Sequence, residues 1–519
     1  MKNAKYQLNN EDVVVIIGSG AGGGTLGNAL AQKGIDVVCL EAGPRLTLAD
    51  IENNDQKMFE KLTWLDERIS EGDLIPNFPL WTCKTTGGTT VHWTAACPRL
   101  EEFETKTRSV YGEIENTNLA DWPFAYKELQ QHYKDAEKLL GVTGTHGVPM
   151  LPANNNYKVM EAGAKKIGYK DTDTNHMAIN PEARDGRPGC LELGFCSAGC
   201  AVGAKWSTLY TEVPRAEATG HYELRPQSMV TRIKMGANNR VTGVEYIDAD
   251  GKLREQKARL VCVAGNAVET TCLLLNSSTS EFSNGLANSS DQVGRNYMRH
   301  VSVPTLAVMP GEVHMYKGAQ IAGVVRDEIR NDPSRGFVGG FQFHTLPFSP
   351  DVLVNLTMNG KWGREVTDIM KDYRNMAGLM AFGEDLADPD NRISLHPTKK
   401  DRNGLPVPIV RYKLHKNSLA MAKYAQQKSE DLYRSLGATK TVSGGLMPST
   451  HNMGVARMGI DPKTSVTNPW GQTHDIDNLF VSDGSLFPSA GSANPTLTII
   501  ALVLRQAKYI GSAVVKGEP

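Results

Sequence analysis

The 519-residue sequence has few cysteines, almost no net charge and no long hydrophobic run. Its 8 cysteines are too few for a disulfide framework. Its 56 lysines and arginines nearly balance 57 aspartates and glutamates, which argues against nucleic acid as the partner, because phosphate binding needs concentrated positive charge. No apolar run reaches the ~18 residues that span a bilayer. The remaining composition is that of a globular protein with chain for about two to four domains.

The first residues show no export signal. Residues 1–12 are polar and of mixed charge, and the apolar run at 13–17 that follows is too short for a signal peptide. The simplest expectation is therefore a cytoplasmic protein. Export of the folded chain together with a partner that carries the signal is the alternative.

Glycine is abundant, with 50 residues, and its first concentration forms a phosphate-binding turn. The β-branched run 13–17 is typical of a strand buried in a parallel sheet. Gly18, Gly20 and Gly23 follow it in the pattern GxGxxG and lead into a predicted helix at 25–33. In this motif the first glycine permits the tight turn, the second lets the backbone approach a pyrophosphate, and the third allows close helix packing.

An acidic residue completes this fingerprint. A second predicted strand at 35–40 ends at Glu41, where a carboxylate would bind a ribose diol. The N-terminus of the intervening helix would supply N–H groups and partial positive charge to the phosphates. The strand, turn, helix and acid together predict a dinucleotide-binding site.

Further motifs are spread over the chain and point to one family. They read GSGAGGG, LEAGPR, GGTTVHW, AGNAVETTCLLLNS, VGRNYMRH, HNMGVARMG and NLFVSDGSLFPSAGSANPTLTI. With this combination the sequence resembles the glucose–methanol–choline (GMC) oxidoreductases, FAD enzymes that oxidise alcohols, from residue 13 to about 505. The resemblance implies an α/β fold, with a Rossmann-like FAD-binding domain and a substrate-binding domain built on a mostly antiparallel sheet flanked by helices.

The resemblance also suggests how the two domains share the chain. The FAD-binding domain is expected from residues 10–48, 82–100, 190–300 and 445–515, and the substrate-binding domain with its connections from 49–81, 101–189 and 301–444. Within the latter, partial alternation predicts strands at 302–309, 319–325, 337–343, 352–358, 391–395 and 410–412. Apolar periodicity predicts helices at 126–140 and 418–436, and a Gly-, Pro- and Asn-rich stretch predicts a loop at 144–157.

Several residues are expected around the flavin by this resemblance. Gly88 lies in a small-residue turn that permits close approach to the ring. His92 stands where relatives can bond the flavin covalently, and packing or hydrogen bonding beside the flavin is the alternative. The segment ending at Val230 is expected near the adenine, and Asp483 near the ribityl chain or pyrophosphate.

Alcohol oxidation removes a hydride from carbon and a proton from oxygen. The flavin takes the hydride, and a base that works near neutral pH, for which histidine is the natural choice, must take the proton. The sequence holds 12 histidines, so the assignment depends on the resemblance, which makes His451 the catalytic base and Asn494 its partner. The amide of Asn494 can donate to the substrate oxygen. The alternatives are a loop histidine and a helix N-cap before Pro495.

Three of the 8 cysteines lie within eleven residues, at Cys190, Cys196 and Cys200, in the glycine-rich loop 186–203. Three thiolates suit an iron–sulfur cluster or zinc with a fourth ligand. A structural disulfide or free thiols are the other possibilities. The C-x5-C-x3-C spacing resembles the segment that holds a 3Fe-4S cluster in bacterial sugar dehydrogenases of this family, which implies that cofactor here.

These features favour an FAD-dependent dehydrogenase of a sugar, glycoside, sugar acid or polyol. Its electrons would leave through the cluster to a cytochrome or another acceptor, and the resemblance implies a small subunit whose export signal would bring the complex to the periplasm. The rival hypotheses are an alcohol oxidase that uses oxygen and an electron-transfer flavoprotein subunit without its own substrate.

Overall fold

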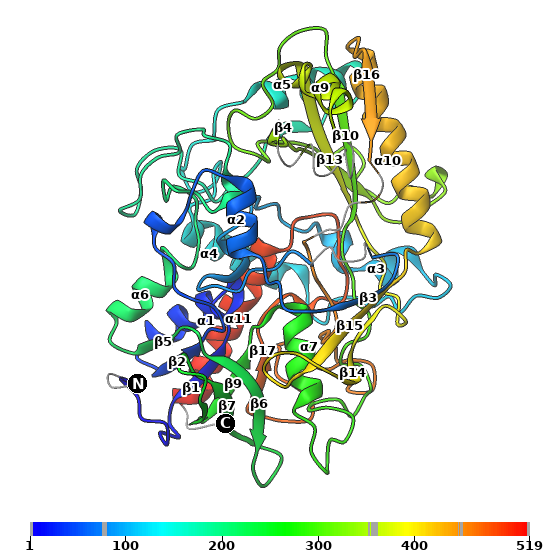
Figure 1. Ribbon diagram of the computed structural model, residues 1–519. Helices are drawn as coiled ribbons and strands as arrows, with labels where there is room; N and C mark the ends of the chain where they lie inside the picture. The colour runs from blue at the N-terminus through cyan, green and yellow to red at the C-terminus, as the bar shows by residue number, and fades with distance from the viewer. Residues whose placement is uncertain are drawn as a thin grey trace.

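The computed structural model describes residues 4–74, 80–350, 353, 362–444, 446 and 450–515. Figure 1 shows a lower body that contains both chain ends and an upper body formed by a second sheet. The termini of the described chain therefore lie on the same side of the molecule, away from the upper sheet (Figure 1).

A five-stranded parallel sheet forms the centre of the lower body. Its strands, in spatial order, are β17 (Leu479–Val481), β9 (Leu260–Val263), β1 (Val14–Ile17), β2 (Val37–Leu40) and β5 (Tyr222–Arg225). The β1, β2 and β9 side chains are all buried, which explains their β-branched, non-alternating sequence. The predicted Rossmann-like sheet is present.

Helices cover this sheet and connect its strands. They are α1 (Ala21–Ala31), α6 (Glu212–Ala218), α7 (Asn266–Asn276) and α11 (Thr496–Val515). α1 packs against both α6 and α11, and α11 also packs against α4 (Tyr126–Leu140). The inner face of α4 packs in the same hydrophobic core as the strands β1 and β2.

One stretch of α11, Thr496–Val514, is long and apolar enough to cross a membrane by length and composition. In the structure 61% of it is buried within the protein. Its contacts with α1 and α4 account for this burial. We therefore interpret α11 as a core helix.

A six-stranded sheet forms the upper body (Figure 1). Its order is β16 (Lys440–Ser443), β10 (Val301–Val308), β13 (Met376–Gly383), β12 (Phe341–Thr345), β11 (Gly323–Val325) and β4 (Thr172–Thr174). Every neighbouring pair is antiparallel. The long helix α10 (Lys416–Ser435) and α5 (Asn155–Lys166) pack against it, so the predicted antiparallel sheet with flanking helices is also present.

Two three-stranded sheets and several short helices complete the fold. β6 (Met229–Met235), β7 (Val241–Ile247) and β8 (Leu253–Lys257) form one sheet, and β14 (Arg392–Lys400), β15 (Pro406–Tyr412) and β3 (Ile69–Gly72) form the other. The other α-helices of the described residues are α2 (Asp55–Leu62), α3 (Thr107–Tyr111) and α9 (Arg364–Met370).

Some predicted boundaries differ from the structure. α1 begins at Ala21 rather than at 25, because the glycines after the turn continue the helix. The predicted loop 144–157 ends early, since the Asn154 side chain accepts a hydrogen bond from the Tyr157 amide and starts α5. The strand expected at 337–343 is shifted to β12, because Gly336 and Gly339 adopt positive φ. The strand expected at 352–358 falls outside the described residues apart from Leu353, which is helical.

Candidate active site

The glycine turn between β1 and α1 is fixed by close packing. Gly18 has a φ of +95°, and a Cβ there would lie 2.5 Å from the Ala264 carbonyl oxygen. A Cβ on Gly23 would lie 2.0 Å from the Gly18 carbonyl oxygen. Gly20 differs, because its nearest described neighbour would be 3.8 Å from such a Cβ. No described side chain caps the N-terminus of α1, and its first turn has no acidic residue, so its N–H groups remain suited to an anion.

Glu41, which directly follows β2, holds this turn in place by hydrogen bonds. Its carboxylate accepts hydrogen bonds from the Ser19 amide at 3.1 Å, the Ser19 hydroxyl at 2.7 Å and the Gly43 amide at 2.8 Å. Burial raises the pKa of Glu41, while these hydrogen bonds oppose the shift. The Ser19 hydroxyl also accepts from the Gly87 amide, and a Cβ on the adjacent Gly88 would lie 3.0 Å from Gly20 Cα. Two glycine turns from distant parts of the sequence therefore meet here.

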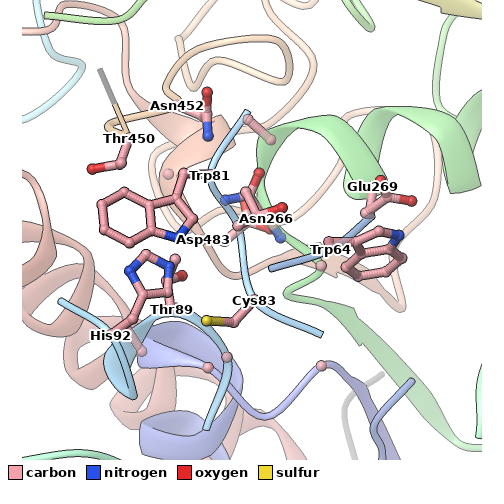
Figure 2. Close-up of a pocket in the computed structure, with 18 of the residues that line it drawn as sticks. Trp64, Trp81, Cys83, Thr89, His92, Asn266, Glu269, Thr450, Asn452 and Asp483 are labelled. Carbon is pink, nitrogen blue, oxygen red and sulfur yellow. The ribbon is translucent and has the colours of Figure 1, made fainter. Parts of the chain in front are cut away.

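Asp483 ties together two further turns of the parallel sheet. It accepts hydrogen bonds from the Asn266 amide at 2.9 Å, the Thr270 hydroxyl at 2.6 Å and the Ser485 amide at 2.8 Å. Burial raises the pKa of Asp483. Figure 2 shows Asp483 directly beside Asn266, and both residues line a cavity. Its carboxylate thus joins the turn after β9 to the turn after β17.

One cavity of about 540 Å³ connects these turns with the upper sheet. Residues of the glycine turns, of β6 and of β13 line it. Nine of the residues predicted from the sequence line it: Gly18, Gly20, Glu41, Gly88, His92, Val230, Asp483, His451 and Asn494. Gly23 does not line the cavity; it packs within α1 against the Gly18 carbonyl oxygen. The fold therefore brings segments more than 400 residues apart in sequence to one chamber.

His92 lies on the cavity wall after the second glycine turn. It is buried, and its ring stacks on that of Trp81 with centroids 4.6 Å apart and planes at 10°, an arrangement that Figure 2 shows. Burial lowers the pKa of His92 to about 3, so the ring is neutral at physiological pH. Its Nε2 has no hydrogen-bond partner among the described residues, which suits either a bond to a ligand or packing beside one.

His451 and Asn494 lie in contact although they are separated by 43 residues. Asn494 Nδ2 is 3.3 Å from His451 Nε2. His451 Nδ1 is 2.9 Å from His300 Nδ1. Burial and the neighbouring His300 and His344 hold the pKa of His451 well below its usual value. The pair therefore combines a neutral imidazole with an amide donor at one point of the cavity wall.

Two more buried histidines, not singled out from the sequence, stand behind His451. The His300 and His451 rings are 4.7 Å apart, and Phe382 packs against His451, His300 and His344. Burial lowers the pKa of His300 to about 4 and that of His344 to about 3. The motif VGRNYMRH ends in His300 and could have pointed to this residue. His344 lies within β12, and no sequence motif pointed to it.

The cysteine loop borders the same cavity. The Ser197 amide, next to Cys196, donates to Gln320 Oε1 at 2.8 Å, and both Ser197 and Gln320 line the cavity. All three loop thiols are free, with Cys196 buried and Cys190 and Cys200 partly exposed. Burial raises the pKa of the Cys190 thiol to about 12. Across the described chain, no three histidine, cysteine or acidic side chains are gathered closely enough to hold a metal ion.

A buried lysine connects this loop to the cavity wall. Lys205 is 1% exposed, and its Nζ donates to the carbonyl oxygens of Val91 at 2.8 Å, Trp93 at 2.6 Å and Cys196. Burial lowers the pKa of Lys205 to about 8, while the neighbouring loop thiols oppose the shift. Sequence reasoning missed this residue, because a single lysine in a mixed-charge chain gives no signal.

Comparison with known proteins supports a common origin for this arrangement. Two family models, both described as GMC oxidoreductase, match residues 77–302 and 387–502. The chain is 32% identical to 2-methyl-1,2-propanediol dehydrogenase of Mycolicibacterium austroafricanum, covering 96% of this chain and 94% of that protein. It is 29% identical to the fructose dehydrogenase large subunit of Gluconobacter japonicus, covering 96% and 97%.

A solved structure shows the same fold. Formate oxidase of Aspergillus oryzae RIB40, from a study of FAD modification, superposes with a TM-score of 0.70 at 13% identity, over 98% of this chain and 99% of that one. The protein therefore belongs to the GMC oxidoreductase family. It is an FAD-dependent oxidoreductase acting on CH–OH donors, and the family and fold class predicted from the sequence are confirmed.

Proposed function

We propose that this protein is a dehydrogenase that oxidises a hydroxyl group of a sugar, glycoside, sugar acid or polyol and passes the electrons out through a 3Fe-4S cluster. The observation that carries the proposal is the contact of His451 and Asn494 inside the cavity that the glycine turns and the cysteine loop share. The named activities of the relatives, on a diol and on fructose, support a polyhydroxylated substrate.

The residues of the lower body fit FAD. The uncapped N-terminus of α1 and the open face of Gly20 suit the pyrophosphate. Glu41 suits a ribose, and Val230, which lines the same cavity, suits contact with the adenine. The unpartnered Nε2 of the buried His92 suits a covalent or close contact with the ring. When bound, FAD supplies the acceptor for the hydride that the carbinol carbon loses.

The chain itself handles the proton. When His451 Nδ1 donates to His300 Nδ1, its Nε2 keeps a lone pair that can take the hydroxyl proton of the substrate. Asn494 Nδ2 lies next to this lone pair and can donate to the same oxygen as negative charge develops. The substrate hydroxyl would thus lose its proton to His451, and a bound FAD would accept the hydride, with both C–H electrons, from the carbinol carbon to leave a carbonyl compound.

The cysteine loop offers the soft thiol donors that an iron–sulfur cluster uses, although the three thiols are not gathered around one point in the described structure. Cys190, Cys196 and Cys200 supply three soft ligands on one loop that borders the cavity. The loop turns repeatedly through positive φ, at Glu192, Gly194, Gly199 and Cys200, which lets a short segment fold around a central group. A bound 3Fe-4S cluster would supply one-electron transfer between a two-electron donor and an external acceptor.

We further propose a partner subunit with an export signal, a cytochrome or another one-electron acceptor, and a periplasmic location. The likeness to a protein named as a large subunit supports an assembly of several chains. Exposed Leu191 and Leu193 on the cysteine loop leave apolar surface close to the proposed exit of the electrons.

A substrate panel tests the reaction. Sugars, sugar acids and polyols are offered to the holoenzyme with an artificial dye under air-free conditions, and oxygen consumption is recorded separately. A dehydrogenase reduces the dye and consumes little oxygen. Rapid oxygen consumption with peroxide formation would establish the oxidase alternative, and failure of every alcohol to bleach the flavin would favour an electron-transfer subunit.

Iron analysis tests the cluster. The air-free holoenzyme is expected to contain iron and acid-labile sulfide and to give an EPR signal in its oxidised state. Zinc in place of iron, or a preparation without metal, would contradict the proposed electron path while leaving the alcohol oxidation untouched.

A further inference from the structure

His300 contacts the ring nitrogen of His451 that Asn494 leaves open. Its Nδ1 lies 2.9 Å from His451 Nδ1, whereas Asn494 Nδ2 lies 3.3 Å from His451 Nε2. His300 directly precedes β10 and is 1% exposed. The proposed base is therefore held between two partners, one at each ring nitrogen.

The geometry of this contact is that of a hydrogen bond between two packed rings. The planes of His300 and His451 meet at 78°, so the rings touch edge to face rather than in a stack. The ring of Phe382, in β13, packs against both, with centroids 6.2 Å from His300 and 5.4 Å from His451. The position of the His300 ring is thus fixed by the upper sheet.

The partners of the two rings decide which nitrogen carries the hydrogen. A bond between two neutral imidazoles needs an N–H on one ring and a lone pair on the other. If His300 were the donor, His451 would carry its hydrogen on Nε2 and point it at the amide hydrogens of Asn494. If His451 is the donor, its Nε2 keeps a lone pair, which suits that amide.

The surroundings of His300 agree with the second arrangement. Burial lowers the pKa of His300 to about 4, and main-chain hydrogen-bond acceptors at Ala490 and Gly491 oppose this shift. The ring is therefore neutral at physiological pH and has acceptors near its own N–H. It can then offer the lone pair of Nδ1 to His451.

We propose that His300 is a positioning residue that keeps the lone pair of His451 on Nε2, toward the substrate, and stabilises the imidazolium formed when His451 takes the hydroxyl proton. Once protonated, His451 donates from Nδ1 to His300 as a cation, and charge-assisted hydrogen bonds are stronger than neutral ones. Burial holds the pKa of His451 well below its usual value, so the imidazolium needs such a partner. This inference rests on the proposed function, because it requires His451 to be the base.

The merely structural alternative is that His300 only fills space behind His451, and two substitutions separate these roles. His300→Leu removes the acceptor and keeps a buried apolar side chain, whereas His300→Asn places an amide oxygen near the former Nδ1. The probe is the alcohol of the substrate panel that bleaches the wild-type flavin fastest. Stopped flow records the bleaching rate of the air-free holoenzyme against alcohol concentration, and flavin absorbance and thermal unfolding report retention of FAD and fold.

His300→Leu is expected to slow bleaching at saturating alcohol by roughly tenfold to a hundredfold, less than removal of the base itself, with little change in the half-saturating concentration. His300→Asn should recover part of the rate. In the His451→Ala background, His300→Leu should cost nothing further, because effects that act through one group are not additive. His344→Gln is the matched control and should bleach at nearly the wild-type rate, since the Nδ1 of this buried histidine pairs with Asn175.

A Leu variant as fast as the wild type overturns the inference, as does a variant that slows the His451→Ala enzyme by the same factor as the wild type. If the Leu variant loses FAD, His300→Asn is compared with His300→Gln, whose longer side chain carries its amide past the Nδ1 position, and equal rates overturn the inference. A His451→Ala enzyme as fast as the wild type refutes the proposed base itself, which distinguishes the two failures.

Discussion

Two regions of the molecule are organised in opposite ways: the proposed catalytic corner, made up of His451, Asn494 and His300, and the cysteine loop. At the catalytic corner the chain supplies its own partners, since His451 contacts both Asn494 and His300 and every ring is packed. On the cysteine loop three thiols are free, and Cys190 and Cys200 are partly exposed. The side chains of the first site are held by contacts within the chain. The thiols of the second site are free for the group that the loop is proposed to bind.

This difference predicts which property of the enzyme a substitution in each region removes. A substitution at the catalytic corner should remove chemistry and leave the cofactors in place. A substitution on the cysteine loop should remove a cofactor and leave the chemistry of alcohol oxidation in place. The predictions below use this contrast, beginning with the largest effect.

Replacing one loop cysteine should abolish the cluster. Cys196→Ser is expected to lose all cluster iron, because a neutral hydroxyl is a poor ligand for iron in place of a thiolate. Substrate should still bleach the flavin. Iron analysis and EPR provide the measurement, and Cys97→Ser is the matched control, since Cys97 is buried outside the loop and its thiol donates to the Ala95 carbonyl oxygen. Full iron content in Cys196→Ser would exclude this ligand.

Replacing the base should slow the chemistry. His451→Ala is expected to lower kcat by roughly 10² to 10⁴-fold, because the proposed proton acceptor next to Asn494 would be lost. Flavin absorbance and iron content should remain. Turnover is followed by dye reduction, and a variant as fast as the wild type would remove His451 from this role.

Replacing the amide should have a smaller effect. Asn494→Ala is expected to lower kcat by about 10²-fold, the low end for loss of one donor to a developing oxyanion. Asn494→His tests the role of Asn494 as a donor. The histidine can still donate a hydrogen bond, so this variant should have a higher kcat than Asn494→Ala. An alanine variant that changes only KM would show that Asn494 binds substrate without acting in the transition state.

Acid should destabilise the catalytic corner through its buried histidines. Folding lowers the pKa of His300 to about 4 and of His344 to about 3, whereas an unfolded histidine titrates near ~6.5. Below that value the unfolded chain binds protons that the folded chain refuses, so stability falls as pH drops from about 6.5 toward 4.

His344→Gln tests this linkage away from the substrate. The variant should reduce the loss of stability between pH 7 and pH 5 by about 2 kcal/mol. Chemical denaturation at the two pH values gives the difference. Equal losses in the variant and the wild type would show that His344 does not contribute to acid sensitivity.

Gly20, the N-cap of α1, and Gly22, in its first turn, should respond differently to alanine. A Cβ on Gly22 would lie 1.8 Å from the Ser482 carbonyl oxygen, so Gly22→Ala should destabilise the fold by about 1–3 kcal/mol. Gly20 has room on its protein side, and Gly20→Ala should keep the fold while weakening FAD binding. Thermal unfolding and flavin content separate the two, and equal unfolding temperatures would contradict the packing account.

Local patterns allowed the parallel-sheet core and its phosphate turn to be predicted. The β-branched run before Gly18, the glycine spacing and the position of Glu41 are consecutive in sequence, so short-range rules suffice. The helix α4 was found in the same way, from its apolar periodicity. Its packing on α11 was not, because that contact joins residues hundreds of positions apart.

The candidate site needed more than local rules. His451 and Asn494 were predicted through a family resemblance, and only the fold shows that they touch. His344 and Lys205 gave no signal, since the importance of each depends on burial and on partners from other segments. The boundaries of the two domains, the ligand roles of the cysteines and the periplasmic location stay predictions.

The most direct test of the central claim is an air-free titration of the holoenzyme with its substrate, followed by flavin absorbance and EPR in the same samples. The account predicts that substrate bleaches the flavin and that the EPR signal of an oxidised iron–sulfur cluster then disappears as electrons enter it. A flavin that bleaches fully in a protein with no iron signal at any stage would contradict it.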